Sequence, residues 1–294
     1  MDEDNELWQR LIAIGLVAAI VLLIGGYLGW LHPLADSLSV GRGMAATAVL
    51  LLAVAASFVG LRMAAFGSLL LAMVTGGQVL LAYNWPGPPG SYLLYQKNML
   101  YRNSDLAGLE ADIRAANPAI VTLQEVSDAN LAMVEALKDR YPHQHFCPGG
   151  RVGGVAILTE LEPVAGTAFC APRLAAMQVV DAERRFWVVS LHLSWPWPYN
   201  QGDHVRELLP VLDKLEGPAV MAGDFNMVRW AISVKRLADI LGVRPAGPTT
   251  GSYIGWSRWA ALPIDHVFAT RSGRVVPRGA LGSDHLGLLA NVEP

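Results

Sequence analysis

Residues 221–228 read MAGDFNMV, an apolar run that ends in a carboxylate, Asp224, followed two residues later by a carboxamide. Far downstream, residues 282–289 read GSDHLGLL, an Asp-His pair before another apolar run. A hydrophobic strand that runs into polar side chains delivers them to the rim of a sheet, so we expect both fragments at one rim of an α/β domain. Carboxylate, amide and imidazole groups at one rim are what a metal-assisted attack of water on phosphorus requires.

The N-terminal part of the chain is too apolar for an ordinary soluble domain. The mean hydropathy of the 294 residues is +0.34, and the excess comes from residues 11–35, 43–61 and 63–96, which contain no Asp, Glu, Lys or Arg. A helix needs ~20 apolar residues to cross the ~30 Å hydrocarbon core of a membrane. We therefore predict a membrane anchor over residues 1–85. Its three transmembrane helices are expected at about residues 11–31, 44–60 and 65–83.

A cleaved signal peptide is the alternative reading of the first apolar stretch. The leader over residues 1–10 is acidic rather than basic, and the stretch that follows it is longer than the apolar core of a signal peptide, about 7–15 residues. No small-residue cleavage site is evident. We therefore expect a retained, multi-pass anchor.

The orientation of this anchor is only weakly determined by charge, because Lys and Arg are almost evenly divided between the two sides of the predicted helices. The two cysteines, Cys147 and Cys170, flank an apparent strand. A disulfide between them would suit an exported domain, whereas two buried thiols are the alternative. We favour a cytoplasmic N-terminus and an exported C-terminal domain.

The second half of the chain has the composition of a soluble α/β domain. A Pro- and Gly-rich linker at residues 86–91 precedes the domain, which we expect over residues 92–294. Strand-like runs are found at residues 119–126, 154–159, 186–193, 219–222, 264–269 and 286–292. Helical patterns are found at residues 104–117, 128–140, 203–215 and 228–241. This alternation predicts sheets covered by helices.

The charge of this domain argues against a protein that grips a nucleic-acid backbone. From residue 86 onward there are 19 Lys and Arg against 20 Asp and Glu, a net charge of −1. Nucleic-acid binding leaves a footprint of clustered basic residues. The domain as a whole has no such excess of positive charge.

Polar residues stand at the ends or edges of the predicted strands in six places. They are Asn98 in YQKNMLYRN, Glu125 in AIVTLQEV, His192 in WVVSLHLSW, Asp224 and Asn226 in AGDFN, Asp265 in LPIDHVFA, and Asp284 with His285 in GSDH. Taken singly, most of these are ordinarily turn residues or packed polar groups, and Gly-Asp-x-Asn is the most specific. The order of the whole set carries the argument.

This ordered set resembles the endonuclease/exonuclease/phosphatase superfamily, and the resemblance covers essentially all of residues 92–294. It implies a four-layer α/β sandwich, in which two packed β-sheets lie between outer helices. It also implies hydrolysis of a phosphoester or pyrophosphate bond by direct attack of water, without a Ser or Cys nucleophile. The domain is short enough that long insertions for substrate recognition are not expected.

The resemblance implies a divalent metal ion, Mg²⁺ with Mn²⁺ as the alternative. Glu125 would bind it through oxygen, and Asn98 would support the same site. Asp284 would support either the metal or the neighbouring imidazole. Magnesium sites keep several waters and use few protein ligands, so a small set of this kind is sufficient.

The remaining site residues are assigned to proton transfer and charge stabilisation, again from the resemblance. Asp265 would orient His285 by accepting a hydrogen bond from one ring nitrogen. Either Asp224 or His285 would take the proton of the attacking water. Asn226 and His192 would donate hydrogen bonds to the phosphoryl oxygens as charge grows in the transition state.

Other motifs carry less weight. His143 and His145 form a His-x-His pair that could bind a metal, but an exposed strand edge is the simpler interpretation. The chain contains no HExxH, Walker loop, CxxC pair or GxGxxG fingerprint, which removes the commonest alternative enzymes.

Two aromatic loops bear on the substrate. Trp195, Trp197 and Tyr199 follow His192, and Trp256 and Trp259 precede Asp265. Trp and Tyr favour the membrane–water interface, although such residues can equally pack their own loops. A tethered site also meets the bilayer at high effective concentration. We therefore expect the membrane bilayer and a phosphorylated lipid as partners, and infer no protein partner.

The layout of short membrane helices before this domain resembles a bacterial subgroup of membrane proteins linked to teicoplanin resistance. That subgroup is proposed to act on undecaprenyl pyrophosphate outside the cytoplasmic membrane. The leading hypothesis is thus a Mg²⁺-dependent hydrolase of a membrane lipid phosphate such as a prenyl pyrophosphate. The alternatives are a membrane-tethered nuclease acting on DNA or RNA and a non-catalytic membrane scaffold.

Overall fold

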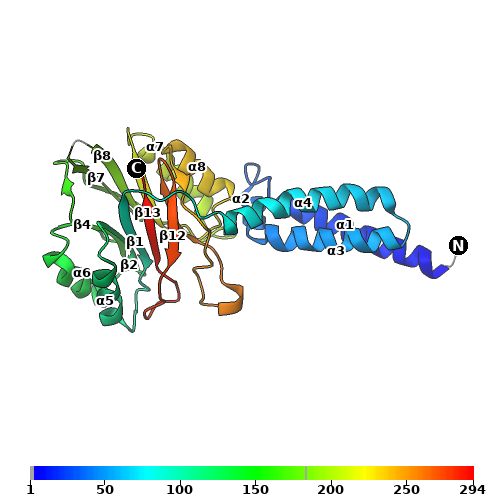
Figure 1. Ribbon diagram of the computed structural model, residues 1–294, viewed down its shortest axis with the longest axis horizontal. Helices are drawn as coiled ribbons and strands as arrows, with labels where there is room; N and C mark the ends of the chain where they lie inside the picture. Colours follow the sequence, from blue (N-terminus) through cyan, green and yellow to red (C-terminus); the bar gives the residue numbers. More distant parts are fainter. Residues whose placement is uncertain (1–2, 183) are drawn as a thin grey trace. The chain divides into compact units, whose positions relative to one another are not determined.

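The computed structural model describes residues 3–182 and 184–294 of the chain (Figure 1). The chain forms two compact units. One comprises the residues up to Asn84 together with Trp230–Ser233, and the other comprises Trp85–Arg229 and Val234–Pro294.

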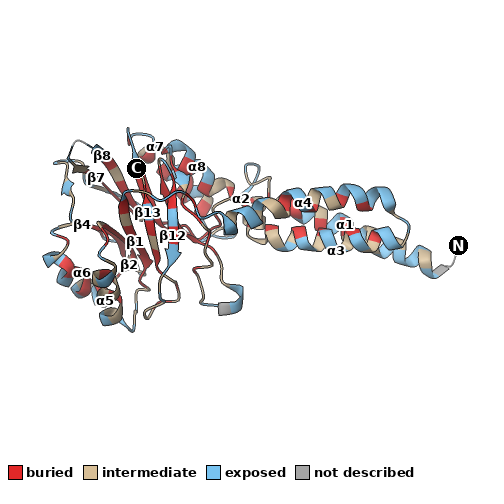
Figure 2. Ribbon diagram, viewed as in Figure 1, coloured by how far each residue is buried: buried red, intermediate tan, exposed pale blue. Residues whose placement is uncertain are grey.

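The N-terminal unit is helical. Its elements are α1 (Glu3–Gly25), α2 (Pro33–Leu38), the short η1 (Ser39–Gly41), α3 (Arg42–Phe58) and α4 (Arg62–Asn84). Three segments of it, Asp4–Gly25, Pro33–Phe58 and Arg62–Asn84, are long and apolar enough to cross a membrane. Val49, Ala53 and Ala56 of α3 are fully buried, and small residues of this kind let helices pack closely. Large apolar side chains are exposed on the outer faces of the helices (Figure 2).

The first helix differs from the predicted range of 11–31, because α1 begins at Glu3 and ends at Gly25. Acidic residues in its first turn suit the positive end of the helix dipole, so the polar leader extends the helix instead of preceding it. Gly25 and Gly26 then end it, since glycine is a poor helix former and gains conformational freedom outside the helix. The other two long helices lie within three residues of their predicted ranges.

The C-terminal unit contains two β-sheets. The first sheet has the order β12 (Gly273–Pro277), β13 (Leu288–Val292), β1 (Tyr92–Asn98), β2 (Ile120–Val126), β4 (Gly154–Thr159), β3 (His143–Cys147). The second sheet has the order β10 (Arg244–Pro245), β11 (Asp265–Ala269), β9 (Ala219–Asp224), β8 (Arg184–His192), β7 (Leu174–Asp181), β5 (Glu162–Pro163), and β6 (Phe169–Ala171) also pairs with β7.

The core of the unit lies between the two sheets. Leu94 and Ile157 of the first sheet pack in one buried cluster with Val188, Val220 and Val267 of the second sheet. Side chains alternate between the faces of a strand, so the neighbouring residues of the first sheet point to its opposite face.

The outer face of the first sheet is covered by helices α5 (Leu106–Ala116) and α6 (Asp128–Ala136). Leu109 and Ile113 of α5 and Met133 of α6 pack there against Tyr95 and Val121 of the sheet. Helices α7 (Gln201–Leu212) and α8 (Ile232–Ile240) complete the fold (Figure 1). The predicted α/β sandwich of two packed sheets with outer helices is confirmed.

Several strands have no counterpart among the sequence predictions. They are β1, β3, β7 and β12, together with the very short β5, β6 and β10. β1 directly continues the uncharged stretch that begins at residue 63, so hydropathy alone does not separate it from the membrane helices. β3 is a polar edge strand with the sequence HQHFC, and β7 contains Ala, Met and Gln, which have weak strand preferences.

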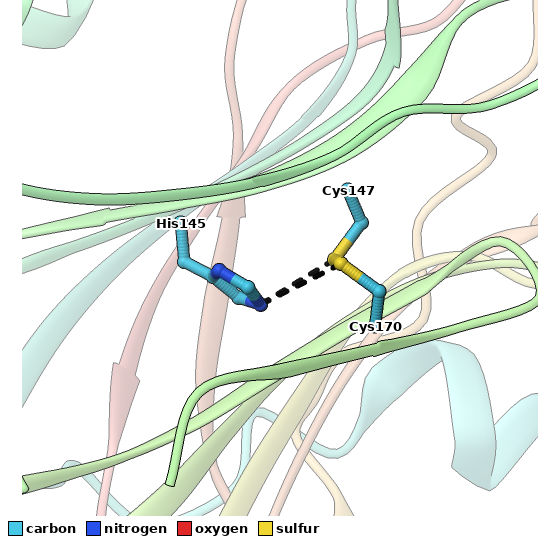
Figure 3. A group of neighbouring side chains, drawn as sticks. All are labelled: His145, Cys147 and Cys170. Carbon is cyan, nitrogen blue, oxygen red and sulfur yellow. Dashed lines mark hydrogen bonds between the residues drawn. A yellow bond between two sulfur atoms is a disulfide. The ribbon is translucent and has the colours of Figure 1, made fainter. Parts of the chain in front are cut away.

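Cys147 and Cys170 form a disulfide, which resolves the alternative left open by the sequence. The bond joins β3 of the first sheet to β6 beside the second sheet. His145 lies next to it, with Nε2 3.4 Å from the sulfur of Cys147 (Figure 3). The same Nε2 lies 2.9 Å from the carbonyl oxygen of Phe169. His143 and His145 both belong to β3, which ends the order of its sheet.

Candidate active site

Strand register brings three of the predicted residues into one row across the second sheet. β9 lies between β8 and β11, and Asp224 pairs with His192 on one side and with Asp265 on the other. On the first sheet, β1 and β2 run parallel with Asn98 opposite Gln124, so Asn98 and Glu125 reach the same end of their strands. The site therefore collects strand ends from both sheets.

His285 completes this row from the loop before β13. Its Nδ1 lies 2.7 Å from Oδ2 of Asp265, and its Nε2 lies 3.8 Å from Oδ2 of Asp224. His192 approaches the same Asp224 oxygen, with Nε2 at 3.5 Å. All four side chains are buried. Asp224, Asp265 and His285 also place their ligand atoms within 4.8 Å of one another.

Asn98 connects the two sheets at the site. Its Nδ2 donates to Oδ2 of Asp224 at 2.9 Å and to Oε1 of Glu125 at 3.2 Å. Its Oδ1 accepts the backbone N–H of Leu100 at 3.0 Å, and this bond fixes which end of the amide faces the carboxylates. Asn98 is therefore placed to orient Glu125 and Asp224, with its nitrogen rather than its oxygen toward them.

Glu125 is held at a break in the β-ladder. The pairing of β2 with β4 shifts between Gln124 and Val126, and Glu125 has a φ of 57° in the left-handed region. Its Oε2 accepts the backbone N–H of Tyr101 at 2.9 Å. Bulges often re-aim a side chain beside an active site, and left-handed backbone at a non-glycine residue is costly unless the surroundings impose it.

The Gly-Asp-x-Asn motif is explained by close contacts. A Cβ at Gly223 would lie 1.8 Å from the carbonyl oxygen of Leu191 on β8, so a side chain there would push β9 away from β8. Asn226 has a φ of 49°, and its backbone N–H donates to Oδ1 of Asp224 at 2.8 Å. Its Nδ2 donates to the carbonyl oxygen of Leu193 at 2.8 Å. Within the described part of the chain, its buried Oδ1 has no hydrogen-bond partner.

Asp284 is the most open of the predicted acids. Its side chain is 35% exposed, and its Oδ1 lies 4.0 Å from Nε2 of His285. Glu125 is next, with a 14% exposed side chain whose Oε1 is 4.0 Å from Nε2 of His192. The structure thus brings every predicted site residue to one end of the sandwich.

The buried groups of the site titrate far from their usual ranges. Burial raises the pKa of Asp224 to about 7, although the positive charge on His285 opposes this. Burial lowers the pKa of His285, but the carboxylates of Asp265 and Asp224 outweigh it and raise that pKa to about 9. Burial and then the charge of Arg173 hold the pKa of His192 well below its usual value. At neutral pH, His285 is therefore protonated and His192 is neutral.

Two cationic residues at the site were missed by the sequence analysis. Nη2 of Arg173 lies 2.9 Å from each ring nitrogen of His192, and burial lowers the pKa of this guanidinium. Lys97 is fully buried, and its Nζ donates to the carbonyl oxygens of Ala280 and His285, both at 2.6 Å. Neither belongs to a recognisable motif. A charged residue next to Asn98 inside a buried strand is the one signal that could have pointed to Lys97.

Gln96 and Gln124 extend the hydrogen-bond network under the site. Nε2 of Gln96 donates to Oδ1 of Asp265 at 2.9 Å and to Oε1 of Gln124 at 2.8 Å. Nε2 of Gln124 in turn donates to Oγ of Ser190 at 3.0 Å. Asp265 is thus fixed by His285 on one oxygen and by Gln96 on the other, which limits its freedom to turn away.

Comparisons with known proteins agree with this fold. A family model described as the Endonuclease/Exonuclease/phosphatase family matches residues 95–285. No curated protein matches the sequence.

Among solved structures, an endonuclease/exonuclease/phosphatase family protein from Leptotrichia buccalis C-1013-b is similar with a TM-score of 0.55 at 15% identity, over 69% of this chain and 100% of that one. A second, from Beutenbergia cavernae DSM 12333, has a TM-score of 0.52 at 21% identity, over 69% and 72%. A mutant beta toxin from Staphylococcus aureus with bound magnesium ions has a TM-score of 0.51 at 13% identity, over 69% and 99%.

These similarities concern the fold, and the family match covers most of the chain, including Glu125, Asp224 and Asp265. Members of the family are metal-dependent phosphodiesterases and nucleases. This chain belongs to the endonuclease/exonuclease/phosphatase family and is a hydrolase of that class.

Proposed function

We propose that this protein is a membrane-anchored, Mg²⁺-dependent hydrolase that cleaves a phosphoester or pyrophosphate bond of a membrane lipid, a prenyl pyrophosphate being the specific candidate. The observation that carries the proposal is the buried series Asp265–His285–Asp224 beside Glu125, in a chain that also has three helices long and apolar enough to cross a membrane.

We assign the general base to Asp224. A catalytic base works best with a pKa near the operating pH, and burial raises the pKa of Asp224 to about 7. His285 is protonated under the same conditions, since the two flanking carboxylates raise its pKa to about 9. His285 therefore serves as a cationic donor to the phosphoryl group, held in place by Asp265 through Nδ1.

Hydrogen-bond donors to the phosphoryl oxygens lie on both sides of Asp224, with His285 on one side and His192 on the other. Neutral His192 and the guanidinium of Arg173 lie together on one side, within 2.9 Å of each other. Asn226 retains one amide hydrogen beyond the bond to Leu193. Donors that are already in place when charge develops lower the barrier without reorganising, and in many enzymes this electrostatic effect contributes most to the rate enhancement.

The donor set fits a hard divalent cation. Glu125 and Asp284 supply carboxylate oxygens that are partly open to solvent, and the buried Oδ1 of Asn226 has no partner within the described residues. Oxygen ligands are those that Mg²⁺ prefers, with Mn²⁺ as the natural substitute. Bound there, the metal would neutralise phosphoryl charge and assist departure of the leaving oxygen. Asp265 and His285 are engaged with each other, and His285 is assigned as a cationic donor to the phosphoryl group and not as a metal ligand.

We place the protein in a bacterial cytoplasmic membrane as a multi-pass protein, with the catalytic domain on the extracytoplasmic side. Apolar helices support the anchor. The disulfide between Cys147 and Cys170 supports the sidedness, because such bonds persist in oxidising compartments. A domain net charge of −1 favours a lipid substrate over DNA or RNA.

The test uses the full-length protein in detergent with Mg²⁺, and compares phosphate release from undecaprenyl pyrophosphate with nicking of plasmid DNA. Asp224→Ala and His285→Ala are the controls. Lipid turnover that both variants abolish, with plasmid left intact, is the expected result. Plasmid cleavage that the variants abolish, without lipid turnover, would establish the nuclease alternative instead. No turnover of either compound by any preparation would overturn the lipid proposal.

A further inference from the structure

Three aromatic side chains form a continuous cluster that adjoins the catalytic imidazole. The ring of Tyr253 lies 5.0 Å from the ring of His285, centroid to centroid. Trp195 lies 6.0 Å from Tyr253, and Trp256 lies 5.7 Å from Tyr253 and 6.3 Å from Trp195. The two tryptophan rings are nearly parallel, with 24° between their planes. We call Trp195, Tyr253 and Trp256 the aromatic platform.

The backbone fixes the platform to the catalytic loop. The N–H of Ile254 donates to the carbonyl oxygen of Asp284 at 2.8 Å, and the N–H of Leu286 donates to that of Ser252 at 2.7 Å. These two bonds hold the segment that contains Tyr253 alongside the segment that contains His285. The platform is therefore part of the rim of the active site and not a separate surface.

A second pair of bonds closes the hairpin that carries Trp256. Tyr253 and Leu262 exchange backbone hydrogen bonds of 2.9 and 3.0 Å. Trp195 comes from the other side, three residues after His192, and its carbonyl oxygen accepts the N–H of Gln201 at 3.2 Å. Both sides of the platform thus begin at residues of the catalytic centre.

The platform is apolar and open. Trp195 is 37% exposed and Trp256 is 72% exposed, so ring surface remains available to a ligand. The loop over residues 193–200 contains no Asp, Glu, Lys or Arg, and the segment over residues 249–264 contains one Arg. Exposed aromatic rings next to the site form an apolar surface of the kind that occurs at ligand-binding sites.

We propose that the aromatic platform is the subsite that binds the apolar chain of the substrate next to its phosphate. This inference rests on the proposed function, and names which part of a lipid phosphate the rim recognises. A hydrocarbon chain needs only apolar contact area, which Trp and Tyr rings provide in large amounts. A stacked nucleobase would be the other possible occupant, but sites for single-stranded nucleic acid pair their aromatic rings with a positively charged groove. The platform loops do not supply one.

The expected effect is a dependence on chain length that the platform controls. Removing one indole takes away roughly 100 Å² of contact with the chain, which corresponds to a loss of about 10- to 100-fold in kcat/KM. The loss applies to a long-chain substrate. It does not apply to a short substrate that has no hydrocarbon part.

The experiment measures kcat/KM of the full-length protein on undecaprenyl pyrophosphate, the long substrate, and on inorganic pyrophosphate, the short substrate, which has no hydrocarbon chain. The variants are Trp195→Ala and Trp256→Ala. The matched control is Trp259→Ala, on the same hairpin, because Trp259 is 100% exposed and makes no ring contact with the platform among the described residues. Turnover of the short substrate reports whether each variant is folded and catalytically intact.

Support for the platform is a 10- to 100-fold loss on the long substrate for both platform variants, with changes under about twofold on the short substrate and for Trp259→Ala. Equal losses on both substrates, no loss at all, or an equal loss for Trp259→Ala would overturn the subsite while the proposed function stands. If the wild-type protein cleaves neither pyrophosphate, the proposed function fails and the subsite fails with it. Cleavage of single-stranded oligonucleotides that the platform variants reduce would assign the rings to bases.

Discussion

The first and second sheets supply different kinds of groups to the same site. From the first sheet comes Glu125, whose side chain is 14% exposed, and the loop before β13 adds Asp284 at 35%. From the second sheet come Asp224 and Asp265, with side chains that are 2% and 0% exposed. Under the proposed mechanism this difference is a division of roles. The more open carboxylates suit a hydrated metal, whereas burial raises the pKa of Asp224 to about 7, which suits proton transfer.

The largest effects on activity are expected from two matched neutral substitutions, one on each sheet. They test the proposed division of roles directly. Asp224→Asn removes the proposed base, so kcat should fall by about 10²- to 10⁴-fold at every Mg²⁺ concentration. Glu125→Gln alters the proposed metal site instead, and should raise the Mg²⁺ concentration for half-maximal activity by at least about 10- to 100-fold. Activity measured over a Mg²⁺ titration separates the two. Recovery of Asp224→Asn at high Mg²⁺ would contradict the assignment.

The disulfide is the covalent bond between the two sheets, and its removal tests how much it contributes to stability. It closes a loop of 23 residues between β3 and β6, so the double substitution Cys147→Ala with Cys170→Ala should lower the free energy of unfolding by about 3 kcal/mol. Denaturant unfolding of the full chain in detergent measures this. Adding reductant to the wild-type protein should reproduce the loss and leave the double variant unchanged. An unaltered stability would mean that packing alone holds the sheets together.

Lys97 links the first sheet to the loop that carries His285. It belongs to β1, and its Nζ donates hydrogen bonds to carbonyl oxygens of that loop. Lys97→Met leaves carbonyl oxygens of that segment without their donor, at a cost of about 1–3 kcal/mol for a buried acceptor. The loosened loop should lower kcat on the order of 10-fold with a smaller change in KM. Faster amide hydrogen exchange confined to residues 279–286 is the matching physical readout. Unchanged exchange there would exclude a positioning role.

His266 of β11, which is buried in the second sheet, should make the stability of the protein depend on pH. Burial lowers the pKa of His266 to about 4, while the hydrogen bond between its Nε2 and the carbonyl oxygen of Met227 opposes the shift. In the unfolded chain the pKa of His266 is near 6.5, so between about pH 4 and pH 6.5 this imidazole is protonated more readily in the unfolded chain than in the folded protein. The contribution of neutral His266 to the free energy of unfolding is therefore fully present above about pH 6.5. It decreases as the pH falls toward 4, by about 2 kcal/mol at pH 5.

His266→Gln keeps a side-chain donor for Met227 but cannot be protonated. Denaturant unfolding at pH 7 and pH 5 should show a smaller difference for this variant than for the wild-type protein. An equal difference in both proteins would assign the acid sensitivity to other groups.

The sequence was sufficient for those parts of the site that depend on strand ends. Asp224 ends β9 and Glu125 lies one residue before the end of β2, so strand register brings each to the end of its own sheet. The packing of the two sheets then brings these ends together. Arg173 and Lys97 could not be found in this way, because their importance depends on which backbone oxygens and rings lie within reach after folding. The orientation of the Asn98 amide likewise depends on a backbone N–H two residues away. The roles assigned to the site residues remain predictions that the variants above test.

The pairing of β13 has a consequence for when the enzyme becomes active. β13 begins three residues after His285 and lies between β1 and β12, joining Val292 to Tyr92 across 200 positions of the chain. During synthesis β1 emerges early, yet its partner and His285 arrive only with the last strand in chain order. A partly synthesised chain lacks His285 in its site, so we expect it to be inactive until residues 285–292 have been made and β13 has paired. Loss of that short segment alone would leave a protein that keeps Glu125 and Asp224 without turning over substrate.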